Sequence, residues 1–209
     1  MQDTKFIYLM DPHCGWCFGY RKTITAFYDR VIKDSSIDFE IVTGGLFIPG
    51  KPGSPKFAND KRPIAERVQR QFGVEFSPAY FENVLAAPSV DSTPGCKAIC
   101  ASNILAESRS LYLSNAIIEA AFIDGQNISL PEVILEIAEE QGFDPDSFGE
   151  KMESQRVADD LGFNLDFAAE VRKGFPAVFV QDNKQNKLMH LGGSNLSVRD
   201  LGEAVDVYL

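Results

Sequence analysis

The chain has 209 residues, of which 44% are hydrophobic and 24% are charged, and its formal net charge is −10. This composition is typical of a globular protein whose core is large enough to fold without metal or disulfide staples. It argues against disordered, collagen-like and coiled-coil proteins. The negative charge argues against nucleic acid or an anionic membrane surface as a partner.

The N-terminal segment lacks the features of a targeting sequence. The apolar run at 6–10 is too short for a signal peptide and has no small-residue cleavage site after it. No stretch approaches the roughly 20 apolar residues that a membrane-spanning helix needs. We therefore expect a cytoplasmic protein with no membrane partner. In such a compartment, four cysteines indicate redox catalysis or metal binding more often than a disulfide scaffold.

The first part of the chain has the pattern of a β-α-β unit. The apolar run at 6–10 predicts a strand, and apolar residues at helical spacing predict a helix after Cys14. The polar residues 34–36 are predicted to stop this helix. Apolar and charged residues then alternate over 37–41, which predicts a second strand.

The middle of the chain is predicted to be helical. A loop dense in proline and glycine at 49–55 marks the boundary. Helix stops are predicted at Gly73, Gly125 and Gly142. One helix start is predicted from the spacing of Ser129 and Glu132, which is that of a capping box. No strand is expected from 57 to 150.

Strands return near the C-terminus. A helical stretch at 154–173 precedes an apolar run at 177–181, a polar turn, and a hairpin partner at 188–191. Ser197 is predicted to cap a last helix. The sequence therefore predicts an α/β fold with the order β-α-β, helices, α-β-β-α and a mixed four-stranded sheet. Residues 1–56 and 151–209 are expected to form the sheet domain, and residues 57–150 an inserted all-helical subdomain.

Cys14 and Cys17 form a Cys-x-x-Cys motif where the first predicted strand meets the first predicted helix. Unpaired N–H groups and the positive end of the helix dipole favour a thiolate at such a position. Cys14 is expected to face solvent and attack, whereas Cys17 is expected to be buried and to resolve the mixed disulfide. Cys-x-x-Cys at this point of a β-α-β unit is a strong redox signal.

Pro176 opens the third predicted strand after Gly174 and Phe175. The residues alone leave two alternatives open, an ordinary proline at the start of a strand or a specified cis bond.

These segments together resemble the DsbA-like branch of the thioredoxin superfamily. The sequence is most similar to the cytosolic FrnE-like group, described as predicted protein-disulfide isomerases. The resemblance rests on the segment 11–20 with its Cys-Gly-Trp-Cys motif, on Gly-Gly-Leu at 44–46, on the helical insertion, and on Gly-Phe-Pro at 174–176. It implies a thioredoxin-like fold and a redox-active Cys14/Cys17 pair that faces Pro176 and its neighbour. With this fold, a cis Phe175–Pro176 bond is the favoured alternative.

The resemblance also implies an activity. It implies a thiol–disulfide oxidoreductase that acts on a disulfide-bearing or thiol-bearing protein or small thiol through a mixed-disulfide intermediate. No bound cofactor is expected, and glutathione or a protein thiol is the expected redox partner. Unlike the periplasmic oxidase, this chain has no histidine between its two cysteines, and Phe175 precedes the proline. We therefore expect a reductase or isomerase rather than a net oxidase.

Four side chains near the motif are candidates for substrate binding. Trp16 offers an apolar contact, and Phe175, ahead of Pro176, offers its backbone to an extended segment. For His13, two alternatives stay open. It is either a protonated neighbour that favours the Cys14 thiolate or a solvent-exposed loop residue.

Cys96 and Cys100 are four residues apart, which is the spacing of one helix face. A core position is the favoured interpretation. A second redox pair is less favoured because a disulfide within one helical turn is geometrically awkward. A four-thiolate zinc site with Cys14 and Cys17 is a further alternative, and we expect no metal.

Two other functions remain open. One is a glutathione-dependent isomerase or transferase like the kappa-class glutathione transferases and 2-hydroxychromene-2-carboxylate isomerases. These share the inserted helices and use a serine near the same helix start. The other is a non-catalytic module whose helical insertion binds a partner.

Overall fold

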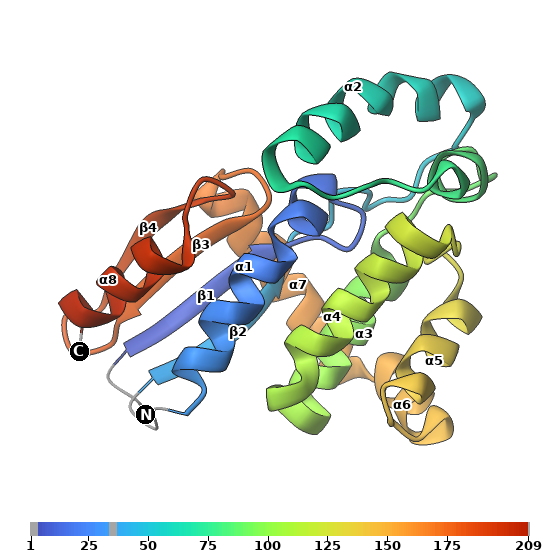
Figure 1. The fold of residues 1–209 in the computed structure, drawn as a ribbon. Helices are drawn as coiled ribbons and strands as arrows, with labels where there is room; N and C mark the ends of the chain where they lie inside the picture. Colours follow the sequence, from blue (N-terminus) through green and yellow to red (C-terminus); the bar gives the residue numbers. More distant parts are fainter. Residues whose placement is uncertain (1–3, 34–36, 209) are drawn as a thin grey trace.

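The computed structural model describes residues 4–33 and 37–208. The predicted helix stop at 34–36 lies outside the described residues. Figure 1 shows the elements in chain order. They are β1 (Thr4–Met10), α1 (Gly15–Val31), β2 (Ile37–Thr43), α2 (Pro55–Phe72), η1 (Tyr80–Val84), α3 (Thr93–Ala106), η2 (Glu107–Arg109), α4 (Ser110–Glu119), η3 (Ala120–Asp124), α5 (Pro131–Glu140), α6 (Pro145–Met152), α7 (Gln155–Val171), β3 (Ala177–Asp182), β4 (Lys187–Gly193) and α8 (Val198–Tyr208).

The four strands form one mixed sheet in the order β2-β1-β3-β4. β1 runs parallel to β2 and antiparallel to β3, and β3 and β4 form an antiparallel hairpin. The predicted α/β fold with a mixed four-stranded sheet is confirmed. The parallel pair places the end of β1 beside the end of β2, and the segment that contains Cys14 and Cys17 starts there.

Helices cover both faces of the sheet. Figure 1 shows α1 and α8 in front of it and α7 behind it. Alternate residues of β1 follow this division. Phe6, Tyr8 and Met10 belong to the larger core, whereas Ile7 and Leu9 belong to a smaller core that packs on α7.

The helices between β2 and α7 form a separate layer beside the sheet. α3 lies at its centre and contacts α4, α5, α6 and α7 as well as β2, and α2 contacts α1 (Figure 1). In the described chain, residues 57–150 contain no strand beyond an isolated bridge of Val90 to Lys51. None of the helices in the described segments is both long enough and apolar enough to cross a bilayer.

Most of the predicted helix stops are confirmed. Gly73, Gly125 and Gly142 adopt the left-handed conformation that glycine tolerates best. The predicted capping box is wrong. α5 begins at Pro131 after an extended Leu130, and the Ser129 hydroxyl accepts a hydrogen bond from the Asp91 N–H instead. The Ser129 hydroxyl, which the local sequence pattern assigned to the start of the helix, therefore bonds to a distant segment instead.

Candidate active site

The Cys-x-x-Cys motif lies at the junction of β1 and α1. A turn between them is closed by the Cys14 N–H, which donates to the Asp11 carbonyl at 3.0 Å. Cys14 occupies the N-cap position with an extended backbone, and its carbonyl accepts the N–H of Phe18. Its side chain makes no capping hydrogen bond, so the thiol is available for chemistry at the helix N-terminus.

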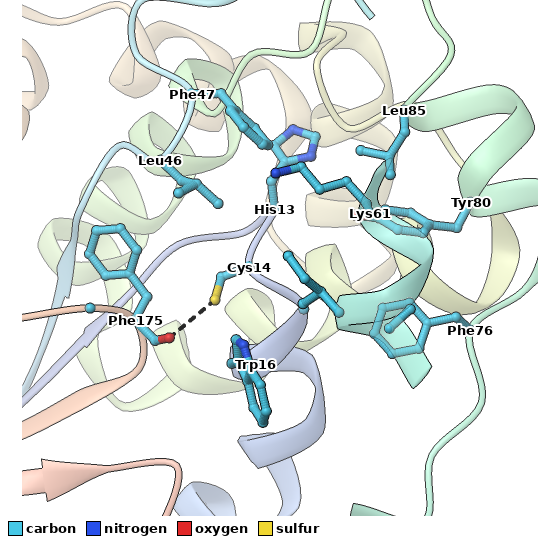
Figure 2. A pocket seen from close by; sticks show the side chains of 14 residues that line it. His13, Cys14, Trp16, Leu46, Phe47, Lys61, Phe76, Tyr80, Leu85 and Phe175 are labelled. Atoms are coloured by element: carbon cyan, nitrogen blue, oxygen red, sulfur yellow. Dashed lines mark hydrogen bonds between the residues drawn. The ribbon is translucent and has the colours of Figure 1, made fainter. Parts of the chain in front are cut away.

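The Cys14 thiol faces the backbone that precedes β3. Its Sγ donates to the Phe175 carbonyl oxygen at 3.4 Å, drawn as the dashed line in Figure 2. The Phe175–Pro176 peptide bond is cis, as predicted, and it lies beside Cys14. The fold thus brings together two segments that are 161 residues apart in the chain. A second cis bond, Ile48–Pro49, was not predicted.

The two cysteines of the motif lie in different surroundings. Cys17 is fully buried, as predicted, whereas the expectation that Cys14 faces solvent is wrong, because only 6% of it is exposed. Burial raises the pKa of the Cys17 thiol well above its usual value, and the adjacent Cys14 thiol raises it further. All four cysteines are free thiols. Cys14 is instead accessible from a cavity.

This cavity has a volume of about 320 Å³ and lies between the Cys14 segment and α2. Figure 2 shows Cys14 and the half-buried Trp16 on one side, with Leu46 and Phe175 near the thiol. Its walls are mostly apolar. The residues that line it are His13, Cys14, Gly15, Trp16, Leu46, Phe47, Lys61, Ile64, Ala65, Phe76, Tyr80, Leu85, Gly174 and Phe175. A ligand in this cavity would touch the Cys14 thiol and would lie against mostly apolar walls.

Asp11 holds the active-site turn in place. Its fully buried carboxylate accepts hydrogen bonds from the His13 N–H at 2.8 Å, the Leu46 N–H at 2.6 Å and the Ser92 hydroxyl at 3.0 Å. These donors come from the motif segment, the loop after β2 and the start of α3. Burial raises the pKa of Asp11 to about 6 despite the hydrogen bonds, which act in the opposite direction.

His13 is buried, with 3% of its surface exposed. Its Nε2 lies 3.1 Å from the carbonyl oxygen of Asp91, so we assign the proton to this nitrogen. Nδ1 is then an acceptor, and it has no hydrogen-bond partner among the described residues. Burial lowers the pKa of His13 to about 4. Both predicted alternatives are therefore wrong, because the side chain is neither protonated near neutral pH nor exposed.

Cys96 and Cys100 lie in the core on α3, which is the favoured interpretation. Burial raises the pKa of both thiols, in the case of Cys100 to about 12. Cys100 accepts a hydrogen bond from the Asn164 amide at 3.4 Å. Within residues 4–33 and 37–208, no three or more His, Cys, Asp or Glu side chains are grouped to hold a metal ion. The four cysteines thus do not form the thiolate set that the zinc alternative required.

Several residues of the site were not predicted. Asp11 and Ser92 anchor the active-site turn, and Lys61 and Tyr80 line the cavity. Asp11 carried a usable signal, since an acidic residue three positions before the first cysteine is placed to accept an N–H of the turn that leads into the motif. Lys61 and Tyr80 carried none, because only the folding of the helical layer brings them to Cys14.

The chain matches one model of a known protein family. A model of the DSBA-like thioredoxin domain matches residues 9–199. A search of curated proteins gave no match.

Solved structures share the fold at low sequence identity. A protein from Nitrosomonas europaea, described as a "putative protein disulfide isomerase", is 18% identical, with 99% of this chain and 98% of that chain covered and a TM-score of 0.84. The cytosolic disulfide reductase DsbM from Pseudomonas aeruginosa is 21% identical, with 97% of each chain covered and a TM-score of 0.78. DsbM has also been solved with GSH, at 21% identity, 97% and 98% coverage and a TM-score of 0.77.

Proposed function

The chain belongs to the family of DSBA-like thioredoxin domains, and from this premise we propose that it is a disulfide reductase or isomerase that works through Cys14 and Cys17. One observation carries the proposal. The Cys14 thiol lies at the helix N-terminus, in an apolar cavity and beside the Phe175 carbonyl, and Cys17 is buried one turn behind it. An accessible attacking thiol with a sheltered second thiol is what a two-step exchange requires.

The first step is attack by the Cys14 thiolate on a substrate disulfide. A new disulfide forms between Cys14 and one substrate sulfur, and the other substrate sulfur leaves as a thiolate that takes a proton. The cis Phe175–Pro176 segment supplies a carbonyl oxygen beside the attacking sulfur. This carbonyl is placed to accept an N–H of a bound substrate once the Cys14 proton has left.

In the second step Cys17 loses its proton and attacks Cys14 Sγ. The Cys14–Cys17 disulfide forms, and the second substrate sulfur leaves as a thiol. Two electrons and two protons have then passed from the protein dithiol to the substrate. Because the Cys17 pKa is raised, this thiol stays protonated until the mixed disulfide has formed beside it. Low-molecular-mass thiols of the glutathione class, or a protein thiol, return the pair to the dithiol form.

The reducing direction is supported by two features. The motif has no histidine between its cysteines, and the structural neighbour DsbM is named a cytosolic disulfide reductase and was solved with GSH. We extend the cytoplasmic location and the use of glutathione to this chain on that basis. No cofactor or metal takes part in the proposed cycle.

A turnover assay tests this function. The protein is mixed with the neutral substrate 2-hydroxyethyl disulfide and with dithiothreitol as reductant, and the thiol product is followed. Catalysis above the uncatalysed rate is expected for the wild type and for Cys100→Ala, and none for Cys14→Ala. Equal rates for the wild type and Cys14→Ala would overturn the proposal.

The same proteins together with Cys17→Ala separate the two alternative functions. Glutathione-dependent isomerisation that survives Cys17→Ala, without net thiol–disulfide exchange, would favour the isomerase or transferase. A native protein whose cysteines react with no disulfide would favour the binding module.

A further inference from the structure

Two lysine ammonium groups lie over the same aromatic ring at the cavity. Lys51 Nζ is 4.0 Å from the centre of the Phe57 ring and 4.5 Å from that of Phe47. Lys61 Nζ is 5.1 Å from the centre of the Phe57 ring. Both lysines are half-buried. The two charges are close enough for Lys61 to lower the pKa of Lys51, and a cation–π contact does not neutralise either of them.

These charges lack an acidic partner in the part of the chain that the structure describes. Lys5, Lys56 and Lys97 each have a carboxylate within 4.0 Å, but neither Lys51 nor Lys61 does. Burial lowers the pKa of Lys51, and the positive charge of Lys61 lowers it further.

One lysine of the pair lines the cavity that contains Cys14, and the other lies next to a residue of its wall. Lys61 lines this cavity, and so does Phe47, on whose ring Lys51 lies. Figure 2 shows the Lys61 side chain extending from α2 into the cavity, on the side of His13. Among the described residues that line it, none is acidic, and His13 is neutral near pH 7. Apart from the Cys14 thiolate that forms in catalysis, Lys61 is therefore the charged group among the described lining residues.

We infer that Lys51 and Lys61 bind a carboxylate of the substrate, so that the enzyme selects low-molecular-mass disulfides that carry one. This inference rests on the proposed function and adds a substrate class to it. A bound carboxylate neutralises both ammonium groups and removes their mutual repulsion. With one sulfur at Cys14, the apolar walls contact the stem of the ligand and the lysines hold its acidic end. A cavity of about 320 Å³ suits one arm of such a ligand.

The test compares two substrates that differ only in charge. 3,3′-Dithiodipropionic acid and its diamide, which has the same length and no carboxylate, are reduced with dithiothreitol as the electron donor, and kcat/KM is measured for each. The wild type is expected to prefer the acid by roughly tenfold, which is typical of a charge-assisted contact in a half-buried site. The ratio of the two kcat/KM values is the quantity compared between variants.

Variants assign this preference to the lysines. Lys51→Gln and Lys61→Gln are each expected to lower the ratio several-fold, mainly through KM, and the double variant to bring it close to one. Lys61→Arg is expected to retain the preference, because it keeps the charge. Lys56→Gln is the matched control. It lies on the same helix, is exposed and pairs with Asp60, so the ratio is expected to stay at the wild-type value.

The outcomes distinguish failure of the inference from failure of the proposed function. A wild type that reduces both disulfides with equal kcat/KM overturns the inference alone, and so does a Lys51→Gln/Lys61→Gln variant that is folded by circular dichroism but keeps the wild-type ratio. A wild type that reduces neither disulfide overturns the proposed function and the inference with it. If the double variant does not fold, the ratios of the two single variants decide in the same way.

Discussion

Two buried titratable groups beside the active site are expected to have opposite effects on stability as pH changes. The Asp11 carboxylate has a pKa raised to about 6 by burial, and the His13 imidazole has a pKa lowered to about 4 by burial. Both side chains are almost fully inaccessible to solvent. Their shifts therefore translate into folding free energy with little screening.

The sign follows from proton linkage. For Asp11, the pKa in the folded protein lies above its ordinary value of 3.8, so its contribution is greatest below about pH 4 and is lost as pH rises through about 6. For His13, the pKa in the folded protein lies below its ordinary value of 6.5, so its contribution is present above about pH 6.5 and is lost as pH falls through about 4. Each shift corresponds to about 3 kcal/mol, and the two terms nearly cancel between pH 7 and pH 4.

Asp11→Asn removes the contribution of Asp11 to the pH dependence of stability and leaves that of His13. Measured by urea unfolding from pH 7 to pH 4, this variant is expected to lose about 3 kcal/mol of stability more than the wild type, because the protonation of His13 on unfolding is no longer offset. His13→Gln is expected to show the opposite difference. Asp166→Asn, at an exposed position on α7, is the control and should follow the wild type. The reasoning is refuted if Asp11→Asn and the wild type have the same pH dependence to within about 1 kcal/mol.

Three further predictions concern the surroundings of the thiols. Ser92→Ala removes a buried hydroxyl that donates to Asp11 and accepts the Phe47 N–H, so the free energy of unfolding should fall by about 1–3 kcal/mol in urea titrations; a loss below about 0.5 kcal/mol would contradict this. A methyl group at Gly44 would overlap the Phe175 ring, so Gly44→Ala should slow disulfide reduction. Gly162→Ala places its methyl group in open space and should reduce disulfides at the wild-type rate. Equal turnover by Gly44→Ala and the wild type would show that the position of Phe175 is unimportant. Iodoacetamide at neutral pH should label Cys14 in the native protein. It should leave Cys17, Cys96 and Cys100 unlabelled until denaturation, because burial raises the pKa of these thiols. Peptide mass spectrometry measures the labelling, and labelling of Cys96 or Cys100 in the native protein would contradict the prediction.

The sequence was most informative where chemistry follows from local position. The Cys-x-x-Cys motif after an apolar strand predicted the strand–helix junction and the burial of Cys17. The Gly-Phe-Pro segment, read with the family resemblance, predicted the cis bond beside Cys14. Both depend on short-range geometry within a β-α-β unit and a strand start, so a single sequence is enough to predict them.

Long-range packing accounts for what the sequence did not show. Cys14 was expected to face solvent because a helix N-terminus is usually exposed, but α2 and the Phe175 segment enclose it. His13 was misjudged because its ring is covered by contacts with Asp91 and Phe47. The Ser129 hydroxyl was assigned to a capping box, yet it contacts Asp91. In each case the partner comes from the helical layer or a distant loop, and neither spacing nor periodicity indicates such a partner.

The central claim is that Cys14 attacks the substrate and Cys17 resolves the intermediate. Mass spectrometry of Cys17→Ser and Cys14→Ser after exposure to oxidised glutathione tests it most directly, followed by peptide mapping of any adduct. The account predicts that Cys17→Ser gains one glutathionyl group on Cys14, and that Cys14→Ser gains none because Cys17 is buried. An adduct on Cys17 in Cys14→Ser, together with none in Cys17→Ser, would contradict it.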